Sequence, residues 1–271
     1  MADAWVKNGG KEVLKQAAVR FNDISDDSAF FFPADVATQE GIDNLAKELS
    51  SRETSLDVLV NNAGMAWMQQ FSLNTWGPAA LTSALAPLLV EAAKKGEGRG
   101  SVILITSVSE SMWFAASPMN GYSLSKAAEA ALTKILANKL VAHGVRGNTI
   151  APGTFPSPGN NPANAIMPSG NAEAFVPMKR NGNADDIAEA FLFLATKASA
   201  YVTGQKLALD GGWSMVLNGR WRLVADGRGR FSLSLRSYTP SKDQFRERCR
   251  HAEVQVEHLL PVKWDSERGP F

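Results

Sequence analysis

The chain has 271 residues, of which 45% are hydrophobic and 20% charged, so its composition is that of a globular protein rather than a disordered one. The formal net charge is +1, which provides no strong field to attract nucleic acid or an anionic membrane surface. The single cysteine, Cys249, excludes an intramolecular disulfide, and with only three histidines the chain has no Cys/His metal site.

The longest apolar runs are too short for a membrane span, which needs about 18 residues. The first residues also lack the basic-then-apolar pattern of a secretory signal. We therefore expect a cytoplasmic protein that has no membrane partner.

Predicted helices and strands alternate along most of the chain. Apolar periodicity predicts strands over residues 29–32, 56–60, 101–106, 145–151 and 206–209. It predicts helices over residues 11–21, 39–49, 73–93 and 127–140, and one that begins near residue 184. This alternation predicts an α/β fold, a doubly wound, Rossmann-like parallel sheet with helices on both faces.

Ligands bind outside the carboxyl ends of the strands in such a sheet. Asn62, Ser107 and Gly153 each follow a predicted strand, so we expect the functional site there. Tyr122 and Lys126 are four residues apart on a predicted helix, which places them on one face. A fixed ammonium beside a tyrosine lowers the phenol pKa from about 10, which would make Tyr122 a proton donor and acceptor near neutral pH.

Residues 217–271 differ in character from the rest and are rich in arginine. Two alternating stretches, Trp221–Val224 and Phe231–Leu235, flank Asp226-Gly227-Arg228-Gly229, which predicts a hairpin. We expect the remainder of this tail to be disordered. Its acidic residues argue against a nucleic-acid partner.

The region from about residue 11 to residue 216 resembles the classical short-chain dehydrogenase/reductases. The resemblance rests on ordered motifs: Asp35-Val36, Asn61-Asn62-Ala63-Gly64, Leu73–Gly77, Ile105-Thr106-Ser107, Tyr122-Ser-Leu-Ser-Lys126, Asn148–Gly153, Thr203-Gly204 and Asp210-Gly211-Gly212. The stretch Pro152–Ser157 is similar to a subgroup of fungal and bacterial reductases related to β-ketoacyl reductases. This implies residues 1–216 as one enzyme domain and residues 217–271 as an atypical tail.

The resemblance implies an NAD(P)-dependent oxidoreductase of secondary metabolism that interconverts a small-molecule ketone and a secondary alcohol. Tyr122 would exchange a proton with the substrate oxygen, and Lys126 would lower the tyrosine pKa and hold the nicotinamide ribose. Ser107 would hydrogen-bond the substrate oxygen, and Asn74 would hold a water that relays protons to Lys126.

The same resemblance implies a set of cofactor contacts. NADP is the expected cofactor, with NAD as the alternative, and homo-oligomers are common in the family. Asp35 would contact the adenine and Asn62 the adenosine ribose region, while Phe155 and Ser157 would hold the carboxamide. The expected cofactor-binding set is Asp35, Asn62, Ala63, Gly64, Tyr122, Lys126, Phe155 and Ser157.

Several of these residues have a structural explanation as well. Asn62 and Asn74 could satisfy backbone groups at a strand end and on a helix, and Asp35 could be a helix N-cap. Ser109 or Ser111 could replace Ser107 as the active serine. The apolar residues near the expected pocket indicate either a bulky substrate or core packing; they are Trp67, Trp113, Phe114 and Met119.

The sequence departs from the family at its start, because the first strand, the glycine-rich turn, its helix and the second strand are absent. No G-x-G-x-x-G run occurs anywhere in the chain, so the usual phosphate cradle is missing. We expect the strand at Phe30 to move in beside the strand at Val58 and cover its edge. The alternatives are that the tail hairpin or a partner chain covers it.

Two functions remain open on the sequence. One is the oxidoreductase, and the other is a related scaffold that binds or dimerises without turnover. A third explanation is that the start and end of the chain come from a misplaced reading frame or an unspliced segment.

Overall fold

The computed structural model describes residues 30–64, 70–111, 120–156 and 176–216, together with the backbone of residues 220–225 and 231–236. The chain divides into two compact units, Met1–Ser214 and Met215–Phe271. The division lies close to the expected boundary at residue 216. The predicted helix over residues 11–21 lies outside the described residues.

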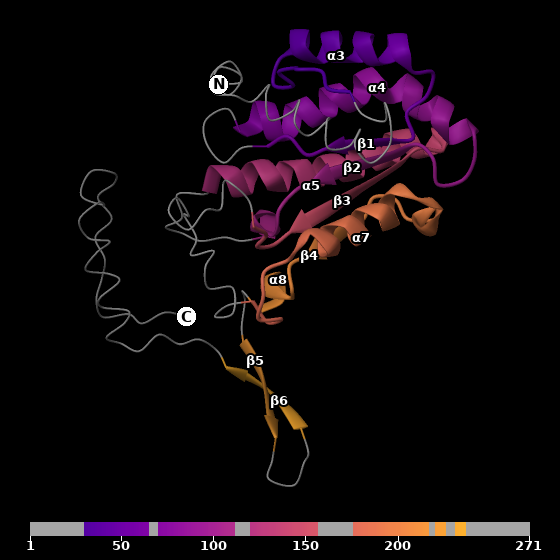
Figure 1. The fold of residues 1–271 in the computed structure, drawn as a ribbon. Helices are drawn as coiled ribbons and strands as arrows, with labels where there is room; N and C mark the ends of the chain where they lie inside the picture. The colour runs from indigo at the N-terminus through magenta and orange to yellow at the C-terminus, as the bar shows by residue number, and fades with distance from the viewer. Residues whose placement is uncertain are drawn as a thin grey trace, which may run out of the picture. The chain divides into compact units, whose positions relative to one another are not determined.

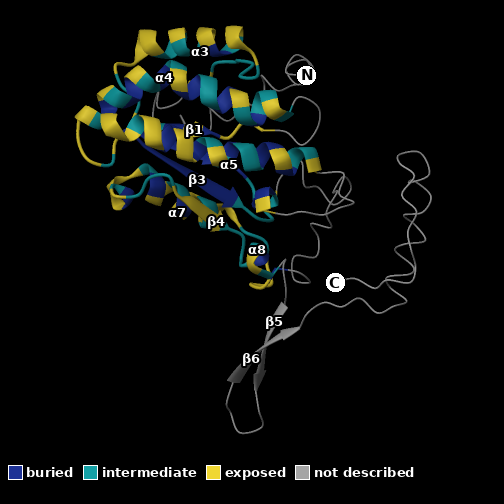
Figure 2. Ribbon diagram, turned by 180° about the vertical axis from the view of Figure 1, so that it is seen from behind, coloured by how far each residue is buried: buried dark blue, intermediate teal, exposed yellow. Residues whose placement is uncertain are grey.

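A parallel sheet of four strands forms the centre of the first unit, in the order β1-β2-β3-β4. The strands are β1 (Val58–Asn61), β2 (Ser101–Ile105), β3 (Arg146–Pro152) and β4 (Lys206–Leu209). β3 is buried along almost its whole length, as its dark blue arrow in Figure 2 shows. The predicted α/β fold with a parallel sheet is confirmed.

Helices cover both faces of this sheet (Figure 1). One face carries α3 (Gln39–Arg52), α4 (Gly77–Lys94) and α5 (Asn120–Leu140), and the other carries α7 (Ala184–Ala195). The short helical segments are η2 (Ser72–Trp76), η3 (Val108–Ser111), η4 (Val141–His143), η7 (Lys197–Ser199) and α8 (Trp213–Val216). Within the described residues, each helix is too short or too polar to cross a membrane.

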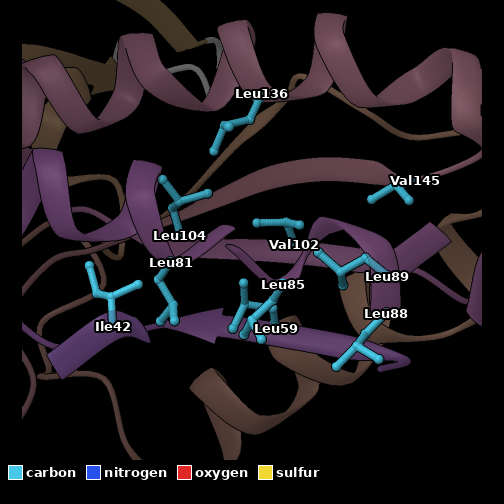
Figure 3. Close-up of a cluster of buried hydrophobic side chains, with 10 residues drawn as sticks. All are labelled: Ile42, Leu59, Leu81, Leu85, Leu88, Leu89, Val102, Leu104, Leu136 and Val145. Atoms are coloured by element: carbon cyan, nitrogen blue, oxygen red, sulfur yellow. The ribbon is translucent and has the colours of Figure 1, made fainter. Parts of the chain in front are cut away.

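Alternation along β2 divides the core into two clusters. Val102 and Leu104 belong to the larger cluster under α3, α4 and α5, whose buried side chains Figure 3 labels. Ile103 faces the smaller cluster, with Ile150 and the α7 residue Leu194. Both faces of the strand are therefore buried, which is why its sequence reads as a continuous apolar run.

The segment that begins at Phe30 is not a strand, and the prediction that it pairs with β1 is wrong. The Phe30 side chain is 50% exposed, and its ring instead lies under the Arg52 guanidinium at 4.5 Å from the ring centroid. Pro33 has no N–H to donate to a ladder, which disfavours a strand at this point. In the described residues, β1 is the first strand of the sheet at this edge.

The second unit contains two antiparallel strands, β5 (Arg220–Ala225) and β6 (Phe231–Arg236). Their register pairs Trp221 with Leu235 and Ala225 with Phe231. These are the stretches for which the sequence predicts a hairpin. The expected disorder of the remaining tail concerns residues outside those described.

Candidate active site

The carboxyl ends of the parallel strands meet at one edge of the sheet. Asn61 lies opposite Leu104, and Ile105 lies opposite Ile150, so the segments that follow β1, β2 and β3 emerge side by side. These segments carry the predicted positions Asn62, Ser107 and Gly153. The sheet register therefore brings the sequence-predicted strand-end residues to one place.

Tyr122 lies near the start of α5, and its side chain shares a hydrogen bond with Ser107, just beyond β2. The Ser107 Oγ also accepts a hydrogen bond from the Ser109 N–H at 3.2 Å, which fixes the turn after the strand. Ser111, by contrast, lies 3.4 Å from the Lys206 ammonium. Of the three serines considered, Ser107 is the one joined to the tyrosine.

Lys126 lies one helical turn after Tyr122, and its residue exposure is only 3%. The ammonium donates to the carbonyl oxygen of Ile105 at 2.8 Å and contacts the Glu129 carboxylate at 2.7 Å. It lies 5.9 Å from the centroid of the Tyr122 ring. Ser107, Tyr122 and Lys126 thus form one contiguous group at the end of β2.

Asn74 is connected to this group from η2, the segment that precedes α4. It lies in η2, a π-helical turn that leads into α4, and its side chain is fully buried. Its Nδ2 donates to the Ser125 hydroxyl at 2.9 Å, and that hydroxyl donates to the carbonyl oxygen of Tyr122 at 2.8 Å. Asn74 therefore satisfies a polar group on a neighbouring helix, as the structural explanation expects, and it also lies beside Tyr122.

The pKa of Tyr122 departs from the direction that the Tyr-Lys spacing predicts. Burial of the phenol raises its pKa above 10, the Ser107 hydrogen bond lowers it, and the charge of Glu129 raises it again, with a net upward shift. The expected lowering is wrong because sequence spacing shows neither the burial nor the carboxylate beside the lysine. Tyr122 consequently holds its proton at neutral pH.

Glu129 is the site residue that the sequence analysis missed. It has no exposed surface, and its burial raises its pKa from 4.5 to about 7 against the opposing effect of Lys126. Its spacing in the sequence could have indicated its place. Lys126, Glu129 and Thr133 are three and four residues apart and form one buried polar stripe on α5. A polar residue on such a stripe is a neighbour of Lys126 rather than a solvent-facing charge.

The residues expected at the cofactor differ in their surroundings. Asn62, Ala63 and Gly64 are all exposed at the end of β1. A Cβ on Gly64 would lie 3.3 Å from both the Lys126 Nζ and the Asn74 Oδ1, so the glycine lets the backbone after β1 pass close to these two groups.

Asp35 forms a turn before α3. Its Oδ1 accepts from the Ala37 N–H at 3.0 Å, and it lines a pocket of about 530 Å³ that also contains Lys47. The N-cap of α3 is Thr38, which accepts from the Gly41 N–H, so the alternative that Asp35 is the cap is wrong.

Phe155 lies beyond β3 and packs its ring against Gly182, where a Cβ would approach a ring carbon to 2.2 Å. It lines a pocket of about 380 Å³ together with Asp210. Ser157, like the apolar residues Trp67, Trp113, Phe114 and Met119, lies outside the described residues.

Comparison with known proteins places these observations in a family. A family model described as enoyl-(acyl carrier protein) reductase matches residues 5–214. The chain is 33% identical over 196 residues to a 3-oxoacyl-[acyl-carrier-protein] reductase of Synechocystis, covering 66% of this chain and 73% of the relative. It is also 33% identical over 223 residues to the rhamnolipids biosynthesis 3-oxoacyl-[acyl-carrier-protein] reductase of Pseudomonas aeruginosa, covering 74% and 82%.

Solved structures share the fold. The RhlG/NADP active-site complex of Pseudomonas aeruginosa aligns with a TM-score of 0.67 at 33% identity, over 75% of this chain and 82% of that one. A gluconate 5-dehydrogenase from Burkholderia cenocepacia in complex with NADP and tartrate aligns with a TM-score of 0.62 at 27% identity, over 74% and 81%. The chain therefore belongs to the classical short-chain dehydrogenase/reductase family of oxidoreductases, and it is similar to the ketoacyl reductases within that family.

Proposed function

We propose that this chain is an NADP-dependent oxidoreductase that reduces a small-molecule ketone, or oxidises the matching secondary alcohol, through Ser107, Tyr122, Lys126 and Asn74. The observation that carries the proposal is the hydrogen bond between Tyr122 and Ser107 at the end of β2, with the Lys126 ammonium below the ring. A phenol and a hydroxyl that meet in this way can both reach one carbonyl oxygen.

Each residue has a chemical task in this proposal. Ser107 donates a hydrogen bond to the substrate oxygen, where negative charge develops, and Tyr122 passes its proton to that oxygen. Lys126 supplies positive charge beneath the phenol as the proton leaves, while Asn74 fixes the start of α5 through Ser125. The nicotinamide cofactor, when bound, supplies the hydride that the carbonyl carbon receives.

The choice of NADP is supported by the relatives, two of which were solved as NADP complexes. Lys126 would contact the nicotinamide ribose and Asn62 the adenosine ribose region, while Asp35 would contact the adenine. The name of the rhamnolipid reductase supports a β-ketoacyl-type substrate and a role in secondary metabolism.

Titration of the purified chain with NADPH, followed by fluorescence and by calorimetry, tests the proposal. Saturable binding, and NADPH consumption when a β-ketoacyl thioester is added, are expected. The Tyr122→Phe variant should bind NADPH and consume it at least about 100-fold more slowly than the wild type. Failure of the wild-type chain to bind at millimolar cofactor would overturn the enzymatic proposal.

The second candidate is a scaffold of the same family that binds a partner without turnover. It is favoured by the absence of a G-x-G-x-x-G run from the sequence, since backbone N–H groups at such a turn hold the pyrophosphate. A chain that sediments as a dimer or larger homo-oligomer, yet neither binds nor consumes NADPH, would support this candidate instead.

A further inference from the structure

The buried face of α5 holds an acid that the proposed reaction does not use. The Glu129 side chain is 0% exposed, and its Oε2 lies 2.7 Å from the Lys126 Nζ. Its other oxygen, Oε1, is buried without a hydrogen-bond partner among the described residues. Burial of a carboxylate is costly unless it is paired, so Lys126 is what makes Glu129 tolerable at this position.

Glu129 also limits what Lys126 can do. An ammonium has three N–H donors. One of them reaches the carbonyl oxygen of Ile105 at 2.8 Å, and a second reaches Glu129. Among the described residues, the cation is therefore held by two acceptors from different elements, β2 and α5.

The charge of the pair matters for the phenol above it. The Lys126 Nζ is 5.9 Å from the Tyr122 ring centroid, and the carboxylate that neutralises it is on the next turn of the same helix. A lone ammonium at this distance would strongly favour the tyrosinate, whereas a paired ammonium favours it much less. Reduction of a carbonyl needs Tyr122 with its proton, and oxidation of an alcohol needs the tyrosinate.

We propose, resting on the function proposed above, that Glu129 is a positioning residue: it holds Lys126 under Tyr122 and cancels part of its charge, so that Tyr122 keeps its proton and the site works as a carbonyl reductase. The upward shift of the Tyr122 pKa, to which Glu129 contributes, agrees with this role. The pKa of Glu129 itself, about 7, means that the effect is complete only above neutral pH.

Other charged groups near Glu129 are accounted for. Among the described residues, Lys126 and Tyr122 on α5 and Glu110 on η3 act on it electrostatically. The Glu110 Oε1 lies 2.6 Å from the Lys206 Nζ of β4, so a cation compensates its charge. Lys126 is the cation paired directly with Glu129, and removal of the Glu129 charge should act on Tyr122 both directly and through Lys126.

The test follows the ionisation of Tyr122 without cofactor or substrate. The near-ultraviolet absorbance of tyrosinate is followed as pH rises. Subtracting the curve of Tyr122→Phe from that of the wild type isolates Tyr122, and subtracting the curve of Glu129→Gln/Tyr122→Phe from that of Glu129→Gln isolates it in the variant. We expect the glutamine variant to ionise Tyr122 at a pH roughly one unit lower, about a tenfold increase in acidity. An unchanged or higher midpoint would overturn the proposal.

Matched variants separate charge from packing. Glu129→Asp keeps the charge and should return the midpoint toward the wild-type value, while Glu91→Gln makes the same chemical change at an exposed site on α4 and should not move it. If Glu129→Gln does not fold, Glu129→Ala takes its place with the same expected shift. A Glu129→Asp midpoint as low as that of Glu129→Gln would contradict a role for the charge.

The titration tests the role of Glu129 separately from the proposed function. A midpoint that moves in a chain without turnover supports the role of Glu129 and counts against the oxidoreductase. An active wild type, an inactive Tyr122→Phe and an unmoved midpoint leave the oxidoreductase standing and reject the role of Glu129.

Discussion

The Asn74 amide donates a 2.9 Å hydrogen bond to the hydroxyl of Ser125, 51 residues further along the chain. Both residues have no exposed surface, and Ser125 in turn donates to the carbonyl oxygen of Tyr122. This chain of hydrogen bonds connects the π-helical turn before α4 to the turn of α5 that carries the tyrosine. The position of Tyr122 therefore depends on an interaction between two helices.

Asn74→Ala should lower both stability and turnover. Loss of a buried hydrogen bond that leaves a partner unsatisfied costs about 1–3 kcal/mol of unfolding free energy. A small displacement of Tyr122 can cost up to about 100-fold in kcat. Urea unfolding and steady-state kinetics measure the two effects. Asn138 is an exposed residue of α5 and provides the control, because Asn138→Ala should change neither stability nor turnover. Equal effects for Asn74→Ala and Asn138→Ala would contradict the dependence of Tyr122 on Asn74.

Gly64→Ala should lower NADPH affinity and turnover while the fold is retained. The added Cβ would lie 3.3 Å from the Lys126 Nζ and from the Asn74 Oδ1, so these groups would have to shift by a few tenths of an ångström. Thermal unfolding should change by much less than turnover does. Wild-type kinetics in this variant would show that the space in front of Lys126 is not where the cofactor lies.

Arg146→Met should destabilise the fold without a direct effect on chemistry. The buried guanidinium donates to the carbonyl oxygens of Ser199, Gly98 and Leu194 at 3.0–3.1 Å, which joins the start of β3 to the end of α7. Acceptors left unpaired should cost roughly 3 kcal/mol in urea unfolding. The exposed pair of Arg99 with Asp57 offers the comparison, and Arg99→Met should stay within about 1 kcal/mol of the wild type. Similar losses of unfolding free energy in Arg146→Met and Arg99→Met would contradict this prediction.

Stability should depend on pH through Glu129, whose pKa rises on folding from 4.5 to about 7. Below 4.5 the carboxyl is protonated in both states, so its contribution is fully present. Between 4.5 and about 7 the unfolded chain has released this proton and the folded chain retains it, so stability falls as pH rises. Above that window there is no further change.

The wild type should therefore lose stability relative to Glu129→Gln as pH rises through this window. Urea unfolding of both chains at several pH values measures the difference, and Glu91→Gln, at an exposed position, should run parallel to the wild type. A difference between the wild type and Glu129→Gln that is constant, or that grows in the opposite direction, would contradict the raised pKa.

The sequence predicts the sheet, and the positions of several candidate site residues along it, because both depend on local patterns. Apolar runs such as residues 101–105 mark buried strands, and Ser107 and Asn62 fall at their ends by chain order alone. The Tyr122 to Lys126 spacing likewise needs only a helix. These features are correct because the tertiary structure does not override them.

The parts that the sequence did not predict depend on neighbours distant in the chain. Phe30 begins an apolar run that reads as a strand, yet no neighbouring strand accepts it and its ring stacks under Arg52 instead. The direction of the Tyr122 pKa shift depends on burial and on the placement of Glu129, which spacing does not report. The alternative that Asp35 caps α3 fails because the side chain of Thr38 takes that place.

The most direct measurement is the rate of NADPH consumption by the wild type and by Tyr122→Phe with a β-ketoacyl thioester, at saturating cofactor. Loss of the phenolic hydroxyl that shares a hydrogen bond with Ser107 should lower kcat by roughly 10²–10⁴-fold, with NADPH affinity unchanged. A Tyr122→Phe chain that turns over as fast as the wild type would show that this phenol does not deliver the proton.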